Sequence, residues 1–452
     1  MGRVLAGIAA AAVVAGTPLR APTTGFLTRA GAQLFDGDTP FRFAGANLYW
    51  LGLDENVGGV HPPTPFRIAD GLATAAGMGA RVVRAHTVGV STGGPLSFEP
   101  ALGVFNASAL NAADYAIAEA EGLGLRLLVP LTDNYHYYNG GKHDFTDWLG
   151  IPEADFYTDA RAIAAFKAYI AARLVHVNPY TGRAARDEPA IAIWETGNEL
   201  SGATAEWTEE IAAYIKSIDA NHLVLDGHYG VDATHATPSV DILSDHYYPI
   251  DAARLAGAAA RAAAAGRVFI AGEYEWTTGP VAAFLAGAAA NANVSGTAFW
   301  SLFPHADGGG FVAHADSFTV NYDPLRADAM AAFLGTFAAH AGAMDGGPGA
   351  PPVSPPAPGA PTVLAATAGV LAWRGAALAA AYDARVSPLN AGGPWAPLAV
   401  GAACAGAAPC LRDDESPAPY NATAAPAGAW VMLASVGVGG ATGAWSAPFQ
   451  VT

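Results

Sequence analysis

Two glutamates that end apolar segments carry the side chains best suited to chemistry. The segment AIAIWETGNEL, residues 190–200, runs from apolar residues into Glu195, Asn198 and Glu199, and a second segment, RVFIAGE, ends at Glu273. An ionised glutamate in an apolar surrounding is costly unless it is paired, hydrogen-bonded or used in a reaction. Two carboxylates that meet across a cleft can hydrolyse a glycosidic bond, one by donating a proton and one by attacking the anomeric carbon. Structural salt bridges are the alternative for each glutamate.

Eight apolar segments have the length and composition of buried strands, and Ala-rich segments with helical periodicity lie between them. The predicted strands are residues 41–47, 81–86, 125–134, 190–199, 222–228, 240–248, 267–273 and 296–300. The predicted helices include residues 66–79, 107–124, 159–175, 204–218 and 252–266. Strands and helices that alternate over about 300 residues predict the α/β class and a (β/α)8 TIM barrel.

Polar residues gather at the C-terminal ends of these predicted strands. Barrel enzymes build their active sites at that end of the barrel, so side chains from distant segments should face one cleft. The residues in question are Asn47, Arg84, His86, Asn134, Asn198, Glu199, His246, Tyr248, Glu273 and Trp300.

Five short motifs follow one another within residues 35–340: VVRAH, WETGNEL, SDHYYP, FIAGEYEW and GTAFWSLF. In type and order they resemble the motifs of glycoside hydrolase family 5, a group of retaining enzymes that includes endo-β-mannanases and cellulases. The resemblance implies that Glu199 is the acid/base, that Glu273 is the nucleophile and that Asn198 holds the sugar's 2-hydroxyl. It also implies substrate-binding roles for Arg84, which would keep the nucleophile ionised, and for His86, His246, Tyr248 and Trp300, the last as a sugar platform.

Two further segments resemble the mannanase branch more than the cellulase branch. They are FAGANLYWLG and LTDNYHYYNGG, which imply that Trp50 and Asn134 line the cleft. Leu200, where proline is frequent, and Glu275, where glycine is usual, depart from the family pattern. We expect a retaining endo-β-1,4-mannanase with carboxyl groups about 5 to 5.5 Å apart. The alternatives are a β-1,4- or β-1,3-glucanase of the same family and a non-catalytic carbohydrate-binding or wall-associated protein.

Glu195 and Glu275 are carboxylates that compete with the two predicted catalytic residues. Glu275 lies two residues beyond Glu273, past the predicted strand end, which makes it the weaker nucleophile. Glu195 is predicted to support the site from inside the barrel mouth. His136 and His143 flank a polar loop without a spaced set of further ligands, so the sequence predicts neither a metal nor a cofactor.

The composition changes sharply near the C-terminus. Residues 345–361, DGGPGAPPVSPPAPGAP, read as a Pro/Gly linker after a catalytic domain at 22–344. Residues 362–452 read as a small all-β sandwich. The segments LAWRG, AYDARVS and GATGAWSAPFQV resemble strands of a fibronectin type III domain, which implies a core position for Trp373. A spacer or interaction domain is favoured over a carbohydrate-binding module, because no clear row of exposed aromatic residues stands out.

The N-terminus and the overall charge indicate an extracellular protein. Residues 1–21 resemble a secretory signal peptide, with one arginine before a short apolar run. The sequons at Asn106, Asn293 and Asn421 are glycosylation candidates. In an oxidising compartment Cys404 and Cys410 would most simply form a disulfide across their Ala/Gly loop. The net charge of −17 argues against nucleic acid as a partner. We expect a monomer that binds a polysaccharide and no membrane.

Overall fold

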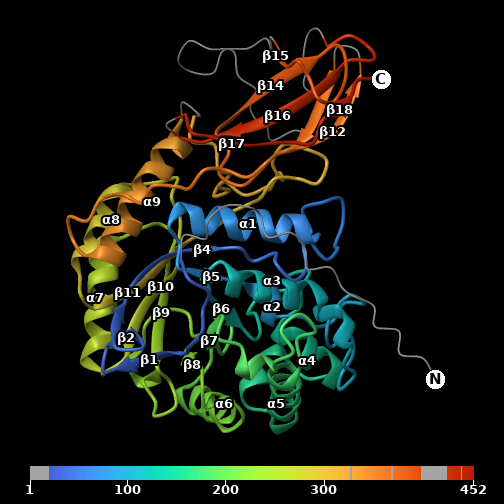
Figure 1. The fold of residues 1–452 in the computed structure, drawn as a ribbon. Helices are drawn as coiled ribbons and strands as arrows, with labels where there is room; N and C mark the ends of the chain where they lie inside the picture. Colours follow the sequence, from blue (N-terminus) through green and yellow to red (C-terminus); the bar gives the residue numbers. More distant parts are fainter. Residues whose placement is uncertain (1–19, 326–327, 368–369, 399–424, 439) are drawn as a thin grey trace.

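The computed structural model describes residues 20–325, 328–367, 370–398, 425–438 and 440–452 (Figure 1). Eight parallel strands form a closed barrel in the order β10-β11-β4-β5-β6-β7-β8-β9. Each lies within or beside one of the eight predicted segments, so the predicted TIM barrel is confirmed. The strands are β4 (Phe43–Asn47), β5 (Val82–Arg84), β6 (Arg126–Pro130), β7 (Ile191–Glu195), β8 (Leu223–Leu225), β9 (Ile242–Tyr247), β10 (Val268–Tyr274) and β11 (Val294–Phe299).

Helices surround the barrel, and the five predicted ones are present. They are α1 (Pro65–Met78), α3 (Asn111–Gly122), α5 (Ala160–Val175), α6 (Ala205–Ile218) and α7 (Ala252–Ala264). The others are α2 (His86–Gly89), α4 (Lys142–Leu149), α8 (Val281–Ala290) and α9 (Ala329–Gly346), with short 3-10 helices η1 (Ala107–Leu110), η2 (Glu153–Tyr157), η3 (Ala185–Asp187) and η4 (Ala233–His235). In the described part of the chain, none of the helices has the length and hydropathy needed to cross a membrane.

The barrel strands are buried along their whole length, as parallel strands covered by helices must be. Phe43 fills part of the interior, and it does so because β11 has a glycine opposite its ring. A Cβ atom on Gly296 would lie 2.0 Å from the Phe43 ring, so a larger residue there would displace the ring.

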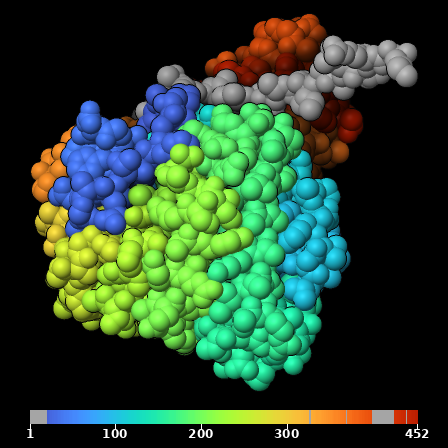
Figure 2. Space-filling view, turned by 90° about the horizontal axis from the view of Figure 1, so that it is seen from below, coloured from blue at the N-terminus to red at the C-terminus, as the bar shows by residue number. Residues whose placement is uncertain are grey.

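An N-terminal double hairpin of three antiparallel strands closes one end of the barrel. The sequence analysis did not predict it. It consists of β1 (Leu27–Ala30), β2 (Gln33–Asp36) and β3 (Thr39–Phe41). Its apolar residues Leu27, Leu34 and Phe41 share a core with residues that begin barrel strands, such as Val82 and Val268. In Figure 2, seen from below, the blue hairpin lies against yellow-green barrel segments, where Arg29 Nε donates to Asp241 at 2.7 Å. The hairpin therefore covers the N-terminal end and leaves the C-terminal end for the site.

In the described residues of the C-terminal module the regular elements are all β-strands, as predicted. Its strands are β12 (Thr362–Thr367), β13 (Val370–Arg374), β14 (Ala381–Ser387), β15 (Ala396–Pro397), β16 (Trp430–Val436), β17 (Thr442–Trp445) and β18 (Phe449–Gln450). β12 pairs with β13, and the other five form a second sheet. Trp373 is buried in the core of the module, which confirms its predicted position. Cys404, Cys410, Asn421 and most of the predicted signal peptide lie outside the described residues.

The module does not stand apart from the barrel. Figure 1 shows it above α1, and the Arg374 guanidinium lies 4.0 Å from the centre of the Phe66 ring at the start of that helix. Leu378 belongs to the hydrophobic core of the barrel and lies against Gly77. α9 continues to Gly346, into the predicted linker, and Val353 from that linker also packs on the barrel core.

Candidate active site

A cavity of about 450 Å³ opens at the C-terminal ends of the barrel strands. It is lined by six of the predicted site residues: His86, Asn198, Glu199, Tyr248, Glu273 and Trp300. A carboxylate oxygen of Glu199, the imidazole of His246 and a carboxylate oxygen of Glu273 all lie within 4.8 Å of one another. The strands thus bring together two glutamates that are far apart in the sequence.

Glu273 is buried at the base of the cavity with a donor on each carboxylate oxygen. Arg84 Nη1 donates to Oε1 at 2.6 Å, and the Tyr248 hydroxyl donates to Oε2 at 2.8 Å. Short hydrogen bonds to both oxygens fix the orientation of a carboxylate. Glu273 is therefore held in one orientation at the base of the cavity, as a nucleophile requires.

Arg84 connects the two halves of the site, and only 1% of its side chain is exposed. Its Nε and Nη2 atoms donate to the two oxygens of Glu195, at 2.8 and 2.9 Å, and Nη2 also donates to Asn198 Oδ1 at 2.8 Å. Burial acts to lower the pKa of Arg84, but Glu195 and Glu273 outweigh it and raise that pKa. Glu195 thus has the supporting role expected of it: it holds the guanidinium that faces the nucleophile.

Glu199 follows β7 in a left-handed backbone conformation, with φ of +50°. The Tyr135 hydroxyl donates to its Oε2 at 2.7 Å, and His246 Nδ1 lies 2.6 Å from its Oε1. Burial acts to raise the pKa of Glu199, but the hydrogen bond and charge of His246 outweigh it and lower that pKa. Burial lowers the pKa of His246, whereas Glu273 and Glu199 raise it, with a net rise. His246 and Glu199 share a proton in this hydrogen bond, and the two opposite shifts in pKa favour placing it on His246.

Replacing His246 with Asn should move the basic limb of the pH–kcat/KM profile to lower pH by about one to two units. In the wild type the raised pKa of His246 keeps the shared proton in place above the ordinary histidine range. Without the imidazole, that proton rests on a carboxyl group that loses it at lower pH. The profile is measured on a soluble substrate, and a basic limb that stays in place would show that His246 does not store the proton.

His86 and Trp300 form the wall beside the nucleophile. Burial and the neighbouring Arg84 charge lower the pKa of His86 well below its usual range, so this imidazole is neutral. Trp300 Nε1 donates to Asp316 Oδ2 at 2.9 Å, and its ring stacks on Tyr49 with centroids 5.1 Å apart and planes 8° from parallel. Both contacts hold the indole at the edge of the cavity, the position predicted for a sugar platform.

Known proteins are similar to parts of this chain in sequence and in fold. Residues 24–252 match the family described as GH family 5 beta-mannosidase-like. The chain belongs to glycoside hydrolase family 5. A mannan endo-1,4-beta-mannosidase 4 of Oryza sativa subsp. japonica is 32% identical over 265 residues, which are 51% of this chain and 56% of that protein. A mannan endo-1,4-beta-mannosidase 3 of Arabidopsis thaliana is 30% identical over 266 residues, 51% of this chain and 63% of that one.

The family 5 match covers part of the relatives and part of this chain. The chain spans about half the length of the first curated relatives it matches. A crystal structure of the endo-1,4-beta-mannanase from Rhizomucor miehei superposes with a TM-score of 0.61 at 24% identity, over 71% of this chain and 100% of that one. That likeness supports the barrel fold.

Two residues predicted to line the family 5 cleft do not line it. The Trp50 side chain is fully buried, donates from Nε1 to the Leu302 carbonyl at 2.9 Å and faces α1, where Gly71 leaves room for its ring. Asn134 lies between two residues that line the cavity, Asp133 and Tyr135, but is not part of the lining. Its Oδ1 accepts from Lys142 Nζ at 2.7 Å and from the Ser201 amide at 3.1 Å, so it ties two loops together instead of facing the cleft.

The loop after β6 supplies site residues that the sequence analysis missed. Asp133 and Tyr135, on either side of Asn134, line the cavity. Asp133 is buried, and both its oxygens lie 3.4 Å from Asn198 Nδ2. Burial raises the pKa of Asp133 to about 8, so it is a neutral acid at neutral pH. The aromatic residues in the segment TDNYHYY could have indicated that this loop lines the site, since rings and polar groups in one loop suit sugar binding.

Asp133→Asn should raise the melting temperature at pH 7 by at least about 2 °C while leaving it almost unchanged at pH 4. Between the ordinary aspartate value of 3.8 and the folded value of about 8, the folded protein binds a proton that the unfolded chain has lost. Stability therefore falls as pH rises through this range, and an amide removes that cost. Equal shifts at both pH values, measured by calorimetry, would contradict the raised pKa.

Glu275 is not a second nucleophile. It is 1% exposed and accepts hydrogen bonds from the Thr277 and Thr278 amides at 2.8 and 2.7 Å. The carboxylate therefore closes the turn after β10 and is absent from the cavity lining.

Proposed function

We propose that the protein is a retaining β-glycanase that hydrolyses β-1,4-mannosidic bonds within mannan-type polysaccharides. The observation that carries the proposal is the approach of Glu199 and Glu273 to within 4.8 Å, each with its own donors. Retaining glycosidases have carboxyl groups about 5 to 5.5 Å apart, whereas inverting enzymes keep about 6.5 to 9.5 Å for a water molecule. The names of the family 5 relatives supply the choice of mannan.

The reaction follows from the two carboxylates in two steps. Glu273 Oε1 or Oε2 attacks the anomeric carbon as Glu199 donates a proton to the departing glycosidic oxygen, which yields a covalent glycosyl-enzyme. Glu199, now ionised, then takes a proton from a water molecule that attacks the same carbon and releases Glu273. His246 supplies the first proton to its 2.6 Å partner Glu199 and receives it back. Two inversions at one carbon give net retention.

A comparison of polymers tests the substrate assignment. Reducing ends released from mannan, glucomannan and carboxymethylcellulose are measured side by side with the same enzyme preparation. We expect mannan and glucomannan to be cleaved and carboxymethylcellulose to be left intact. Cleavage of carboxymethylcellulose alone would assign a glucanase. No cleavage of any of them, together with retained binding in a pull-down on insoluble mannan, would assign a carbohydrate-binding protein.

The proposal includes the compartment and the form of the protein. We propose a secreted monomer in which residues 362–452 form a fibronectin type III-like module. The β-sheet content of the module and the buried Trp373 support this assignment. Expression in a secreting host, followed by N-terminal sequencing of the medium fraction, tests the predicted removal of residues 1–21. Protein found only inside the cells would contradict secretion.

A further inference from the structure

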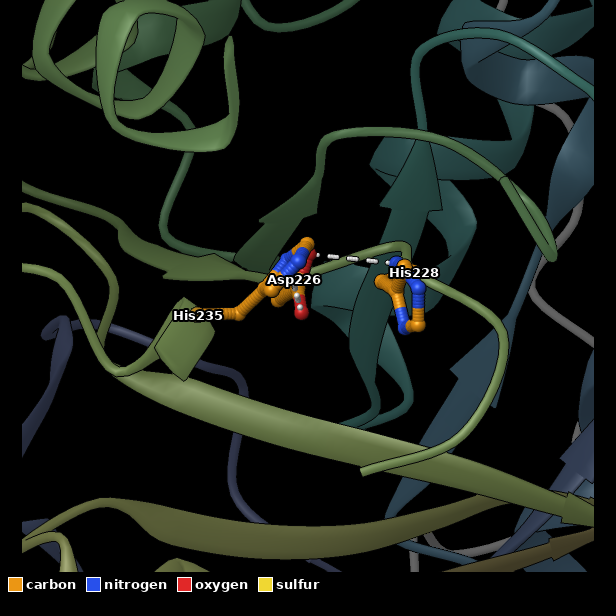
Figure 3. Close-up of side chains that lie close together, drawn as sticks. All are labelled: Asp226, His228 and His235. Carbon is orange, nitrogen blue, oxygen red and sulfur yellow. Dashed lines mark hydrogen bonds and ion pairs between the residues drawn. The ribbon is translucent and has the colours of Figure 1, made fainter. Parts of the chain in front are cut away.

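A second group of ligating side chains lies behind the acid/base, outside the reaction path. Asp226 and His228 come from the loop that follows β8, and His235 comes from η4 (Figure 3). One ligating atom from each of the three lies within 4.8 Å of the other two. We propose that Asp226, His228 and His235 form a binding site for a divalent transition-metal ion, with zinc as the best match.

The donor set fits a zinc-class ion. Two imidazoles and one carboxylate suit zinc and its neighbours better than magnesium or calcium, which prefer oxygen ligands alone. His235 Nδ1 lies 3.2 Å from Asp226 Oδ2. Two ligands of one tetrahedral zinc ion, each about 2.0 to 2.1 Å from the metal, lie about 3.3 Å apart. The separation therefore matches one edge of a zinc tetrahedron as well as it matches a hydrogen bond.

His228 can supply the third ligand atom. His228 Nδ1 lies 3.2 Å from the Gly230 carbonyl and can donate to it, which leaves the lone pair on Nε2 free for a metal. The His228 and His235 rings have centroids 4.4 Å apart. Both imidazoles therefore lie beside the carboxylate of Asp226.

The surroundings favour a cation and leave room for a fourth ligand. The Asp232 carboxylate caps η4, the 3-10 helix that carries His235, and accepts from the Thr234 amide at 2.8 Å. A small cavity of about 10 Å³, lined by Asp226 and His228, has the size that one water molecule needs. Asp226 and His235 are 2% and 3% exposed, whereas His228 is half-buried, so an ion enters from the side of His228.

An ion at this site would fix the loop behind the acid/base. The Leu200 amide donates to the Gly227 carbonyl at 2.7 Å, so the residue after Glu199 is bonded to the residue between two of the ligands. Tyr229, next to His228, lines the substrate cavity. Zinc would therefore act on the shape of the cleft without contact with the sugar. The sequence predicted no metal site, because the histidines it singled out, His136 and His143, lie in another loop.

Zinc titration of the EDTA-treated full chain tests the proposal. We expect calorimetry with zinc chloride to show one equivalent bound with a Kd in the micromolar range or tighter. The melting temperature should rise by at least about 3 °C at a hundredfold excess over Kd. His228→Gln, at a half-buried position outside the catalytic machinery, should weaken binding at least tenfold and still fold. His136→Gln, the control, should bind as the wild type does.

Three results would overturn the assignment. The first is the absence of zinc binding by the wild type at millimolar zinc. The second is equal affinity of the His228→Gln variant and the wild type. Anomalous diffraction at the zinc edge separates this site from the catalytic group of Glu199, His246 and Glu273, since a peak at the latter alone would also refute the proposal.

Discussion

Glu273→Ala should lower kcat on an activated mannoside by at least about 10⁴-fold, the scale on which loss of a nucleophile acts in covalent catalysis. Glu273 is the carboxylate that receives Arg84 Nη1 and the Tyr248 hydroxyl, and its removal leaves these two donors facing an empty space. Azide fits that space and accepts the same hydrogen bonds. External azide should therefore restore turnover and yield a glycosyl azide of inverted anomeric configuration, which NMR identifies.

Two variants control this experiment. Glu273→Gln should be as inactive as Glu273→Ala but should not respond to azide, because the amide fills the space that azide needs. Glu275→Gln removes the charge of the neighbouring carboxylate, which is bonded to the Thr277 and Thr278 amides, and should keep the activity of its folded fraction. Full activity of Glu273→Ala, or azide rescue at position 275 instead, would show that the nucleophile is misassigned.

Arg84→Met should destabilise the fold by about 3 to 5 kcal/mol, the usual cost of removing one partner from a buried ion pair. It should also lower kcat by about 10³-fold. The guanidinium donates hydrogen bonds to both oxygens of Glu195, to one oxygen of Glu273 and to the amide oxygen of Asn198. Methionine keeps the bulk but leaves two buried carboxylates without their cation. Chemical denaturation gives the stability, and kcat is measured on the folded fraction well below the midpoint.

Arg173→Met is the matched control for this loss. Arg173 is also fully buried, but its Nε and Nη2 atoms donate to the Val88 carbonyl at 3.2 and 3.0 Å, away from the cleft. This variant should lose stability and keep kcat. Arg84→Lys should fall between wild type and Arg84→Met, because an ammonium keeps the charge but not the planar fork that grips Glu195. Equal kcat for the Arg84→Met and Arg173→Met variants would show that Arg84 does not contribute to catalysis beyond stabilising the fold.

The barrel could be predicted from sequence because each strand is a short apolar segment between helical ones. The hairpin β1–β3 could not, since its strands have four, four and three residues and only Leu27, Leu34 and Phe41 turn inward. Strands this short carry little periodicity. The packing of Leu378 on Gly77 was also out of reach, because nothing in a Pro/Gly linker tells where the following module docks.

For the site, the position of a residue at the end of a strand was a better predictor of whether it lines the cavity than its residue type. Glu199, Glu273 and Arg84 occur at strand ends and converge, because the closed barrel sends such residues to one mouth. Trp50 and Asn134 follow strands too, but their orientation depends on loop geometry. The ring of Trp50 turns towards α1 because Gly71 leaves a space there, and Asn134 turns towards Lys142. In the loop after β6, Asp133 and Tyr135 line the cavity instead of Asn134.

Glu199 has a left-handed backbone conformation, with φ of +50°. The residue that gives the most stable fold at this position therefore differs from the residue that the reaction needs. Glycine and asparagine adopt this conformation readily, whereas a glutamate there carries strain on the order of 1 kcal/mol. Judged by folding alone, an inactive residue is the better occupant of position 199. Drift under selection for stability would therefore run towards a barrel that keeps its shape and loses its chemistry. The glutamate at position 199 therefore lowers the stability of the fold by about this amount, and it is the proposed acid/base role that offsets the loss.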